Sequence, residues 1–220
     1  MKTERAFSLL ELLVVVGLIA VLAVTAIGTF GNNEATALRA AQATLANFIV
    51  AARTKAVATN RPVRLLVNVD PGSPDRFLRQ TVLQIQEGAA WTTLGEASLP
   101  QGVYVLPGNF ALPPGLLAAD AAGWTRNDGS SLRSTAFRSA NLLTEAILSP
   151  DPETWMALPI AAVGTTNSPG DIVLSSGRRR APGEFGAGES PVELSRPEQV
   201  RGLSVSTYGV ATLIDRRGNF

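Results

Sequence analysis

The chain has 220 residues, of which 45% are hydrophobic and 17% are charged, and 19 Lys and Arg oppose 18 Asp and Glu for a formal net charge of +1. A charge this close to zero argues against a strongly basic nucleic-acid binder or an acidic tail. The chain contains neither His nor Cys, which excludes His-based catalytic triads, cysteine nucleophiles, disulfide frameworks and the common zinc sites.

A long apolar segment follows the first few residues. Residues 12–33 contain no charged side chain, which gives 22 uncharged positions. A helix of this length is roughly 33 Å long, which matches the hydrocarbon core of a bilayer, about 30 Å thick. Lys2 and Arg5 precede the segment, and positive charge favours the cytoplasmic side. The sequence therefore predicts a single-pass transmembrane helix at residues 7–30, with the N-terminus in the cytoplasm and the rest of the chain outside.

Three interpretations of this segment compete. A secretory signal peptide would use a cleavage site of small residues, offered by Ala20, Ala23 and Ala26, and a plain membrane anchor would use only the length. Neither explains Glu11, a carboxylate within the apolar stretch, unless it merely sits at the membrane interface beside the cationic leader. Ionisable groups are costly in lipid and are usually paired and functional there. Glu11 therefore favours a third interpretation.

The decapeptide from Ala6 to Val15, AFSLLELLVV, resembles the type III signal of type IV prepilins and type II secretion pseudopilins. The resemblance implies that a prepilin peptidase removes residues 1–6 as a leader by cutting between Ala6 and Phe7, and that it N-methylates Phe7. The family most often has Gly before the cut, where this chain has Ala6. The resemblance further implies a structural, non-enzymatic subunit of the bacterial inner membrane, which joins other pilins through its N-terminal helix and becomes part of a filament.

The position of Glu11 suits this processing. Cleavage leaves a cationic amino group on Phe7 at the start of a helix, and Glu11 lies four residues on, one turn away on the same face. A carboxylate near a helix N-terminus is also favoured, by about 0.3–1 kcal/mol. The resemblance implies that Glu11 pairs with the N-terminal amine of a neighbouring subunit during assembly, which would neutralise both charges in lipid.

A second apolar pattern, at residues 34–59, has the spacing of an amphipathic helix. Its apolar side chains recur every three or four residues: Leu38, Ala41, Leu45, Phe48, Ile49, Ala52 and Ala56. The sequence Asn60-Arg61-Pro62 marks its end. Joined to the apolar segment, this pattern predicts one helix from Phe7 to about Thr59, with one half in the membrane and the other packed on a sheet.

Residues 62–220 carry mainly strand signals. Alternating segments at 62–69 and 76–86 flank a turn cluster at 70–75, and together they predict a hairpin with a longer loop. Further strands are expected at residues 91–94, 102–106, 155–163, 171–174 and 202–214. We also expect a short helix at 141–148.

Two segments lack a regular pattern. Residues 107–128 are rich in Gly, Pro and Ala and are expected to be irregular. Residues 175–199 are rich in Gly, Pro, Arg and Glu and predict a mobile loop with one short strand near 192–194.

The junction from Ala51 to Leu65 is similar to the helix-to-strand junction of the GspH/FimT group of minor pseudopilins and minor pilins. The resemblance implies that residues 31–220 form a pilin-like periplasmic domain. The expected fold class is α+β, with a long N-terminal helix whose second half packs on small antiparallel sheets.

The densest positive charge in the chain is Gly177-Arg178-Arg179-Arg180, and Arg216-Arg217 is a second cluster. Arg binds phosphates through paired N–H groups, and some FimT-like pilins are associated with DNA uptake through a Gly-Arg-x-Arg arrangement that the first cluster matches. The resemblance therefore leaves a second function open, a DNA-binding minor pilin for DNA uptake. The plainer interpretation is a solvated loop whose arginines are balanced by Glu184 and Glu189.

Two carboxylate pairs, Asp70/Asp75 and Asp151/Glu153, lie in Pro-rich turn contexts. They are predicted to be turn residues rather than calcium ligands, because no ligand-dense loop surrounds them. We therefore expect neither a metal nor a cofactor.

Overall fold

The computed structural model of the protein describes residues 9–118 and 123–220, with side chains from residue 34 onward. The chain divides into two compact units, Met1–Thr36 and Ala37–Phe220. Helix α1, Leu9–Thr59, begins in the first unit and ends in the second, and the second unit holds the sheets. The predicted long helix is therefore confirmed from Leu9 onward, while its first two residues lie outside the described ranges.

The second half of α1 packs through the apolar stripe that the sequence predicts. Phe48 is partly buried, and the other members of the stripe are fully buried: Leu38, Ala41, Leu45, Ile49, Ala52 and Ala56. The helix ends at Thr59, and the φ of the next residue, Asn60, is 50°, a left-handed conformation that Asn tolerates better than most side chains. Pro62 follows and has no N–H group to continue the helix.

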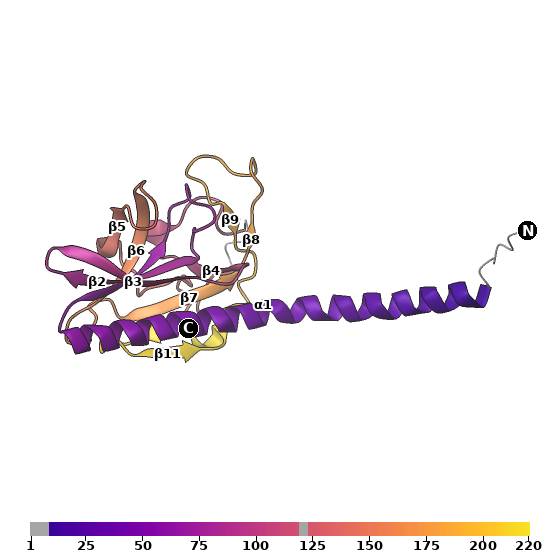
Figure 1. Ribbon diagram of the computed structural model, residues 1–220, viewed down its shortest axis with the longest axis horizontal. Coiled ribbons are helices and arrows are strands. Elements are labelled where there is room, and N and C mark those ends of the chain that lie inside the picture. Colours follow the sequence, from indigo (N-terminus) through magenta and orange to yellow (C-terminus); the bar gives the residue numbers. More distant parts are fainter. Residues whose placement is uncertain (1–8, 119–122) are drawn as a thin grey trace, which may run out of the picture. The chain divides into compact units, whose positions relative to one another are not determined.

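Within the described residues, the rest of the second unit consists of two antiparallel sheets and a two-stranded ribbon (Figure 1). The five-stranded sheet has the order β3-β2-β1-β6-β5, with bounds Ala90–Ser98, Gln80–Glu87, Val63–Asn68, Glu153–Ile160 and Leu142–Glu145. The four-stranded sheet has the order β11-β10-β7-β4, with bounds Ala211–Ile214, Val200–Val205, Gly170–Ser176 and Val103–Leu106. The ribbon pairs β8, Arg178–Arg179, with β9, Val192–Glu193. Short 3-10 helices lie at Asn109–Ala111, Ser139–Asn141 and Arg217–Asn219.

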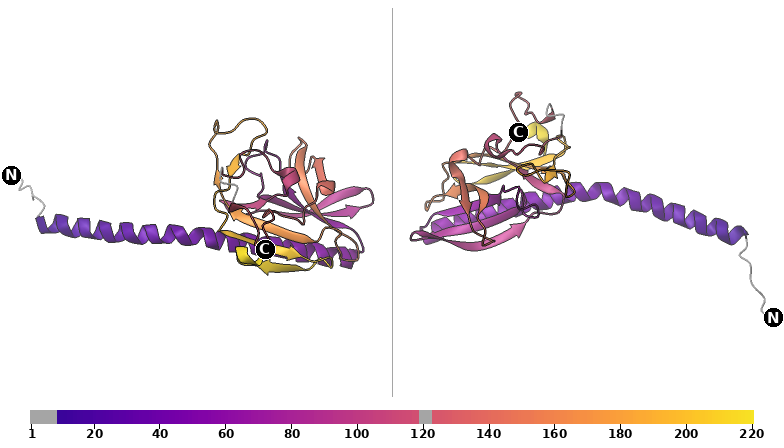
Figure 2. Two further views of the ribbon diagram at one scale, coloured as in Figure 1. Left: turned by 180° about the vertical axis from the view of Figure 1, so that it is seen from behind. Right: turned by 90° about the horizontal axis from the view of Figure 1, so that it is seen from above.

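Strand β1 lies at the centre of the five-stranded sheet, and all six of its residues are buried. One face contributes Val63, Leu65 and Val67 to the main core, which also contains residues of α1 and of the four-stranded sheet. The other face contributes Leu66 to a smaller core that contains Val82, Trp155 and Ala157. Figure 2 shows both sheets lying against the second half of α1. The expected α+β fold, a helix packed on small antiparallel sheets, is confirmed.

The hairpin predicted at the start of the β-rich part is confirmed. Strands β1 and β2 pair antiparallel, with Val63 opposite Ile85 and Val67 opposite Thr81. The turn cluster at 70–75 lies in the connection between them. The strand expected at 91–94 is longer than predicted, because β3 continues to Ser98 along β2.

The prediction of a short helix at 141–148 is wrong. Residues Leu142–Glu145 form β5, an edge strand in which Leu142 lies opposite Met156 and Leu143 opposite Trp155. Leu143 also packs against the smaller core beside Trp155. Pairing with β6 thus outweighs the helical propensity of a Leu- and Glu-containing segment.

The single strand expected at 202–214 is instead a hairpin of β10 and β11. The turn between them is closed by Ser206 N–H bonding to the Val210 carbonyl at 2.9 Å. Gly209 in this turn has a φ of 66°, and a Cβ there would lie 2.5 Å from the Gly164 carbonyl oxygen. The short strand expected near 192–194 is confirmed as β9. It pairs with β8 inside the same segment, and the Leu194 N–H donates to the Leu116 carbonyl oxygen at 2.7 Å, which ties the 175–199 segment to the fold.

Candidate functional site

The predicted processing site lies outside the described residues. Ala6 and Phe7 precede Leu9, and Glu11 lies in α1 but its side chain is not among those described. Cleavage before Phe7, methylation of Phe7 and pairing of Glu11 therefore stay predictions, as does the membrane span at 7–30. Over the part of the chain that the structure describes, no helix combines the length and apolarity that a membrane crossing requires.

The three arginines of the predicted phosphate-binding run lie on and beside the β8–β9 ribbon, and each has a partner. Arg178 pairs with Glu193 at 2.6 Å and with Glu184 at 3.3 Å. Arg179 pairs with Asp75. Arg180 donates to the carbonyl oxygens of Glu184 and Ser190, and its Nη1 lies 4.0 Å from a Glu189 carboxylate oxygen.

These pairs agree with the plainer interpretation, arginines balanced by Glu184 and Glu189, and add two partners that lie elsewhere in the sequence. The hydrogen bond and charge of Glu193 raise the pKa of Arg178. The backbone N–H of Ala181 lowers the pKa of Glu184, and the charge of Arg178 adds to that effect. A phosphate would have to displace these carboxylates before it could bind the ribbon.

The five-stranded sheet contains a buried arginine that no sequence pattern indicated. Arg64 of β1 is 7% exposed and donates to the Gln84 side-chain oxygen at 2.9 Å. Its two Nη atoms bond the two carboxylate oxygens of Glu145 at 3.1 and 2.5 Å. Its guanidinium carbon lies 4.2 Å from the centre of the Trp91 ring, so the cation also stacks on an aromatic face. Arg64 thus links β1, β2, β3 and β5.

Glu153 requires a correction, because it is not a turn residue. It begins β6 and is buried, with 3% exposed. One carboxylate oxygen accepts from Asn68 Nδ2 at 3.1 Å, and the other accepts from Ser73 and Arg76. Asp70 keeps the predicted turn role, since it accepts the backbone N–H two residues further on at 2.8 Å. Among the described residues, no group of three or more His, Cys, Asp or Glu could hold a metal ion.

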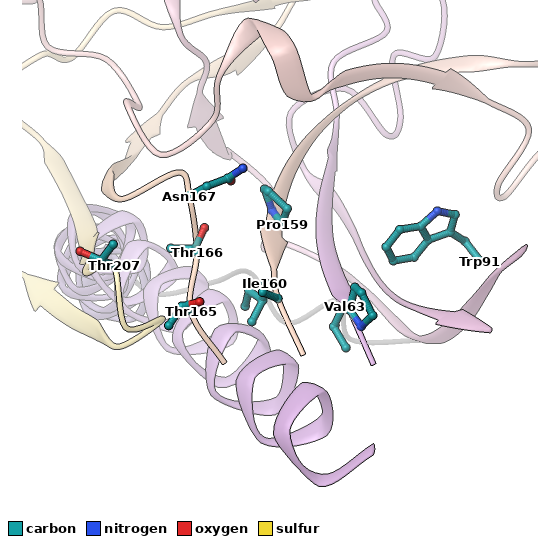
Figure 3. A pocket seen from close by; sticks show the side chains of 10 residues that line it. Val63, Trp91, Pro159, Ile160, Thr165, Thr166, Asn167 and Thr207 are labelled. Atoms are coloured by element: carbon teal, nitrogen blue, oxygen red, sulfur yellow. The ribbon is translucent and has the colours of Figure 1, made fainter. Parts of the chain in front are cut away.

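An open hollow of about 610 Å³ lies beside Trp91, at the end of the sheet nearest the C-terminal end of α1 (Figure 3). Its walls are apolar side chains and threonines: Pro62, Val63, Trp91, Pro159, Ile160, Ala161, Thr165, Thr166, Asn167 and Thr207. None of these side chains is ionisable. The hollow therefore offers a contact surface, and no ionisable side chain in its lining could act as the base that activates a threonine hydroxyl.

The comparisons with known proteins bear on the N-terminus and on the whole chain separately. Residues 1–27 match the family model described as the prokaryotic N-terminal methylation motif, which confirms the resemblance found at residues 6–15. A solved structure, the minor pseudopilin EpsH from the Type 2 Secretion System of Vibrio cholerae, is similar at a TM-score of 0.40 and 14% sequence identity, covering 83% of this chain and 97% of that one. No curated protein matches the chain significantly in sequence.

Proposed function

We propose that the protein is a structural subunit of a type II secretion pseudopilus or a type IV pilus, a minor pseudopilin or pilin that performs no catalysis. The observation that carries this proposal is the match of residues 1–27 to the prokaryotic N-terminal methylation motif. The helix that follows supports it, because α1 runs from the motif into a domain where its second half forms part of the main core.

In this proposal, a prepilin peptidase cuts between Ala6 and Phe7 and methylates the new N-terminus. Residues 7–30 then hold the subunit in the bacterial inner membrane, with residues 31–220 in the periplasm. The uncharged run at 12–33 is long enough for this role, and the basic leader favours a cytoplasmic N-terminus.

Assembly then depends on Glu11. Its carboxylate pairs with the N-terminal amine of a neighbouring subunit, so that neither charge remains alone in lipid. An unpaired charge there is expensive, which would make the pairing a condition for packing the apolar helices side by side.

The mass of the mature N-terminus tests the proposal. In cells with a working prepilin peptidase, the purified full chain is expected to begin at an N-methylated Phe7. A strain without the peptidase is the control and should yield intact Met1. Intact Met1 in the strain with the peptidase would overturn the proposal. Glu11→Ala should be inserted and processed but excluded from filaments, with Glu34→Ala, outside the apolar run, as the matched control.

DNA uptake through Arg178, Arg179 and Arg180 gains no support from the comparisons. The three side chains are also occupied by partners within the domain. We therefore do not propose DNA binding as the function.

A further inference from the structure

A second hollow of the globular unit, of about 670 Å³, is lined mainly by polar and charged side chains: Arg39, Gln42, Ala43, Arg201, Leu213, Asp215 and Arg216. Its three arginines come from three places. Arg39 lies on α1, Arg201 on β10, and Arg216 two residues after the end of β11. The fold thus brings together cations that are far apart in the sequence.

Arg201 is held in place by buried structure. Gln42 is 3% exposed, and its amide nitrogen donates to the carbonyl oxygens of Gly202 at 2.7 Å and Ile214 at 3.0 Å. Its remaining oxygen accepts from Arg201 at 3.4 Å, and Asp215 pairs with the same guanidinium at 2.5 Å. Gln42 therefore fixes both the wall of the hollow and one of its cations.

Arg39 and Arg216 are exposed, and no carboxylate pairs with either of them among the described residues. Asp215 neutralises Arg201, so the hollow has two uncompensated positive charges in a chain whose net charge is only +1. The β8–β9 ribbon differs, because its arginines have carboxylate partners. The hollow is therefore better prepared than the ribbon to bind an anion.

The position of Arg39 in the chain indicates which anion. It lies six positions after Asn33, the last residue of the uncharged run. Six residues of chain span at most about 20 Å in any conformation. Arg39 therefore stays near the headgroup layer of a bilayer that contains the uncharged run. Phospholipid phosphates lie in that layer at high local concentration.

We propose that this hollow binds the phosphate headgroup of an anionic phospholipid. The inference rests on the proposed function, because it requires residues 7–30 to lie in the membrane. Arg39 and Arg216 bind the phosphate oxygens, the Arg201–Asp215 pair forms a neutral part of the wall, and Leu213 provides an apolar contact. Binding seats the globular unit on the membrane surface before the subunit enters a filament.

The test titrates phosphatidylglycerol into the full chain in neutral detergent micelles and counts bound lipid by native mass spectrometry. The native chain is expected to bind phosphatidylglycerol about 10–30-fold more tightly than Arg39→Gln/Arg216→Gln, since each arginine near an anionic surface contributes about fivefold. Lys55→Gln/Arg138→Gln, which removes two exposed cations outside the hollow, should bind like the native chain. Phosphatidylcholine should bind the three proteins equally.

Equal binding of phosphatidylglycerol by the native chain and the Arg39→Gln/Arg216→Gln variant would overturn the proposal. So would inorganic phosphate that competes at the same concentration as the lipid, because the site would then serve a free anion. The proposal would also be overturned if the native chain formed dimers and the Arg39→Gln/Arg216→Gln variant did not. The hollow would then bind a second copy of the chain instead of a lipid. Membrane extraction and the mass of the N-terminus, measured on the same variants, report the proposed function independently. A chain that is processed normally but fails the lipid titration contradicts only the lipid site.

Discussion

Charged residues of the five-stranded sheet and of the β8–β9 ribbon form similar ion pairs but differ in burial. The side chains of Arg64 and Glu153 are 8% and 4% exposed, whereas that of Arg178 is 59% exposed. Water screens an exposed pair, so its net contribution to stability is small. A buried charge that loses its partner stays uncompensated and destabilises the fold. The densest run of charge in the sequence is thus not the place where charge matters most to the structure.

The largest effect is expected at Glu153. Glu153→Ala removes the acceptor for Asn68, Ser73 and Arg76 and leaves the buried Asn68 side-chain nitrogen without its acceptor. We expect the free energy of unfolding to fall by about 3 kcal/mol. Urea unfolding of the full chain in detergent, followed by circular dichroism, measures the change. Asp151→Ala, an exposed carboxylate two residues away, is the control and should unfold like the native chain. Equal midpoints for the two variants would contradict the burial argument.

A somewhat smaller loss is expected for Glu145→Ala. The change leaves Arg64 buried with Gln84 and Trp91 but without its carboxylate. Because the Glu145 side chain is 38% exposed, the expected loss is about 2 kcal/mol, below that for a fully buried pair. The double variant Arg64→Met/Glu145→Ala should recover most of it in the same unfolding assay, since no buried charge remains. A double variant less stable than the single one would refute this account.

Gln42→Ala measures how much free energy of unfolding is lost when a buried neutral side chain, instead of a buried charged one, is removed. It leaves the Gly202 and Ile214 carbonyls without the amide that now bonds both, for an expected loss of about 1–2 kcal/mol. Asn47→Ala, at an exposed position of the same helix, should cause no loss. Hydrogen exchange should localise the effect of Gln42→Ala to β10 and β11. Faster exchange spread evenly over both sheets would argue against a local tie.

The smallest effect is expected on the ribbon. Arg178→Ala should leave the unfolding midpoint unchanged, because its partners Glu184 and Glu193 remain hydrated when the arginine is removed. A shift in midpoint as large as that of Gln42→Ala would contradict the claim that exposed ion pairs contribute less to stability than buried polar groups. The same variant should also bind DNA no more weakly than the native chain at each salt concentration.

The sequence predicted correctly the helices and strands that are determined by the pattern of neighbouring residues. The stripe from Leu38 to Ala56 follows the helical period, and the turn cluster at 70–75 separates two alternating strands, so α1 and the β1–β2 hairpin were predicted correctly. The segment at 141–148 was not, because its conformation depends on pairing with β6. The processing motif around Phe7 was predicted from sequence alone and agrees with the family model at residues 1–27.

The roles of the buried polar residues lay beyond sequence reasoning. Gln42 contacts residues 160 and 172 positions away, and Glu153 contacts residues up to 85 positions away. Neither contact leaves a periodic or motif signal near the residue itself. The one available hint is a polar side chain within an otherwise apolar strand, such as Arg64 between Val63 and Leu65. Such a position predicts a partner but does not identify it.

The central place of β1 has a consequence for the order of events during synthesis. Its β2 neighbour follows directly, but its other neighbour, β6, is made much later, since Val63 pairs with Ile160. At about 5–20 residues per second, a ribosome needs about 5–20 s to reach that partner. During this interval β1 keeps one edge open, and its apolar faces remain uncovered by β6. Contacts this distant also slow folding once the chain is complete. The growing chain therefore exposes a strand edge with unpaired backbone groups, which other chains could pair with, well before the domain can complete its sheet.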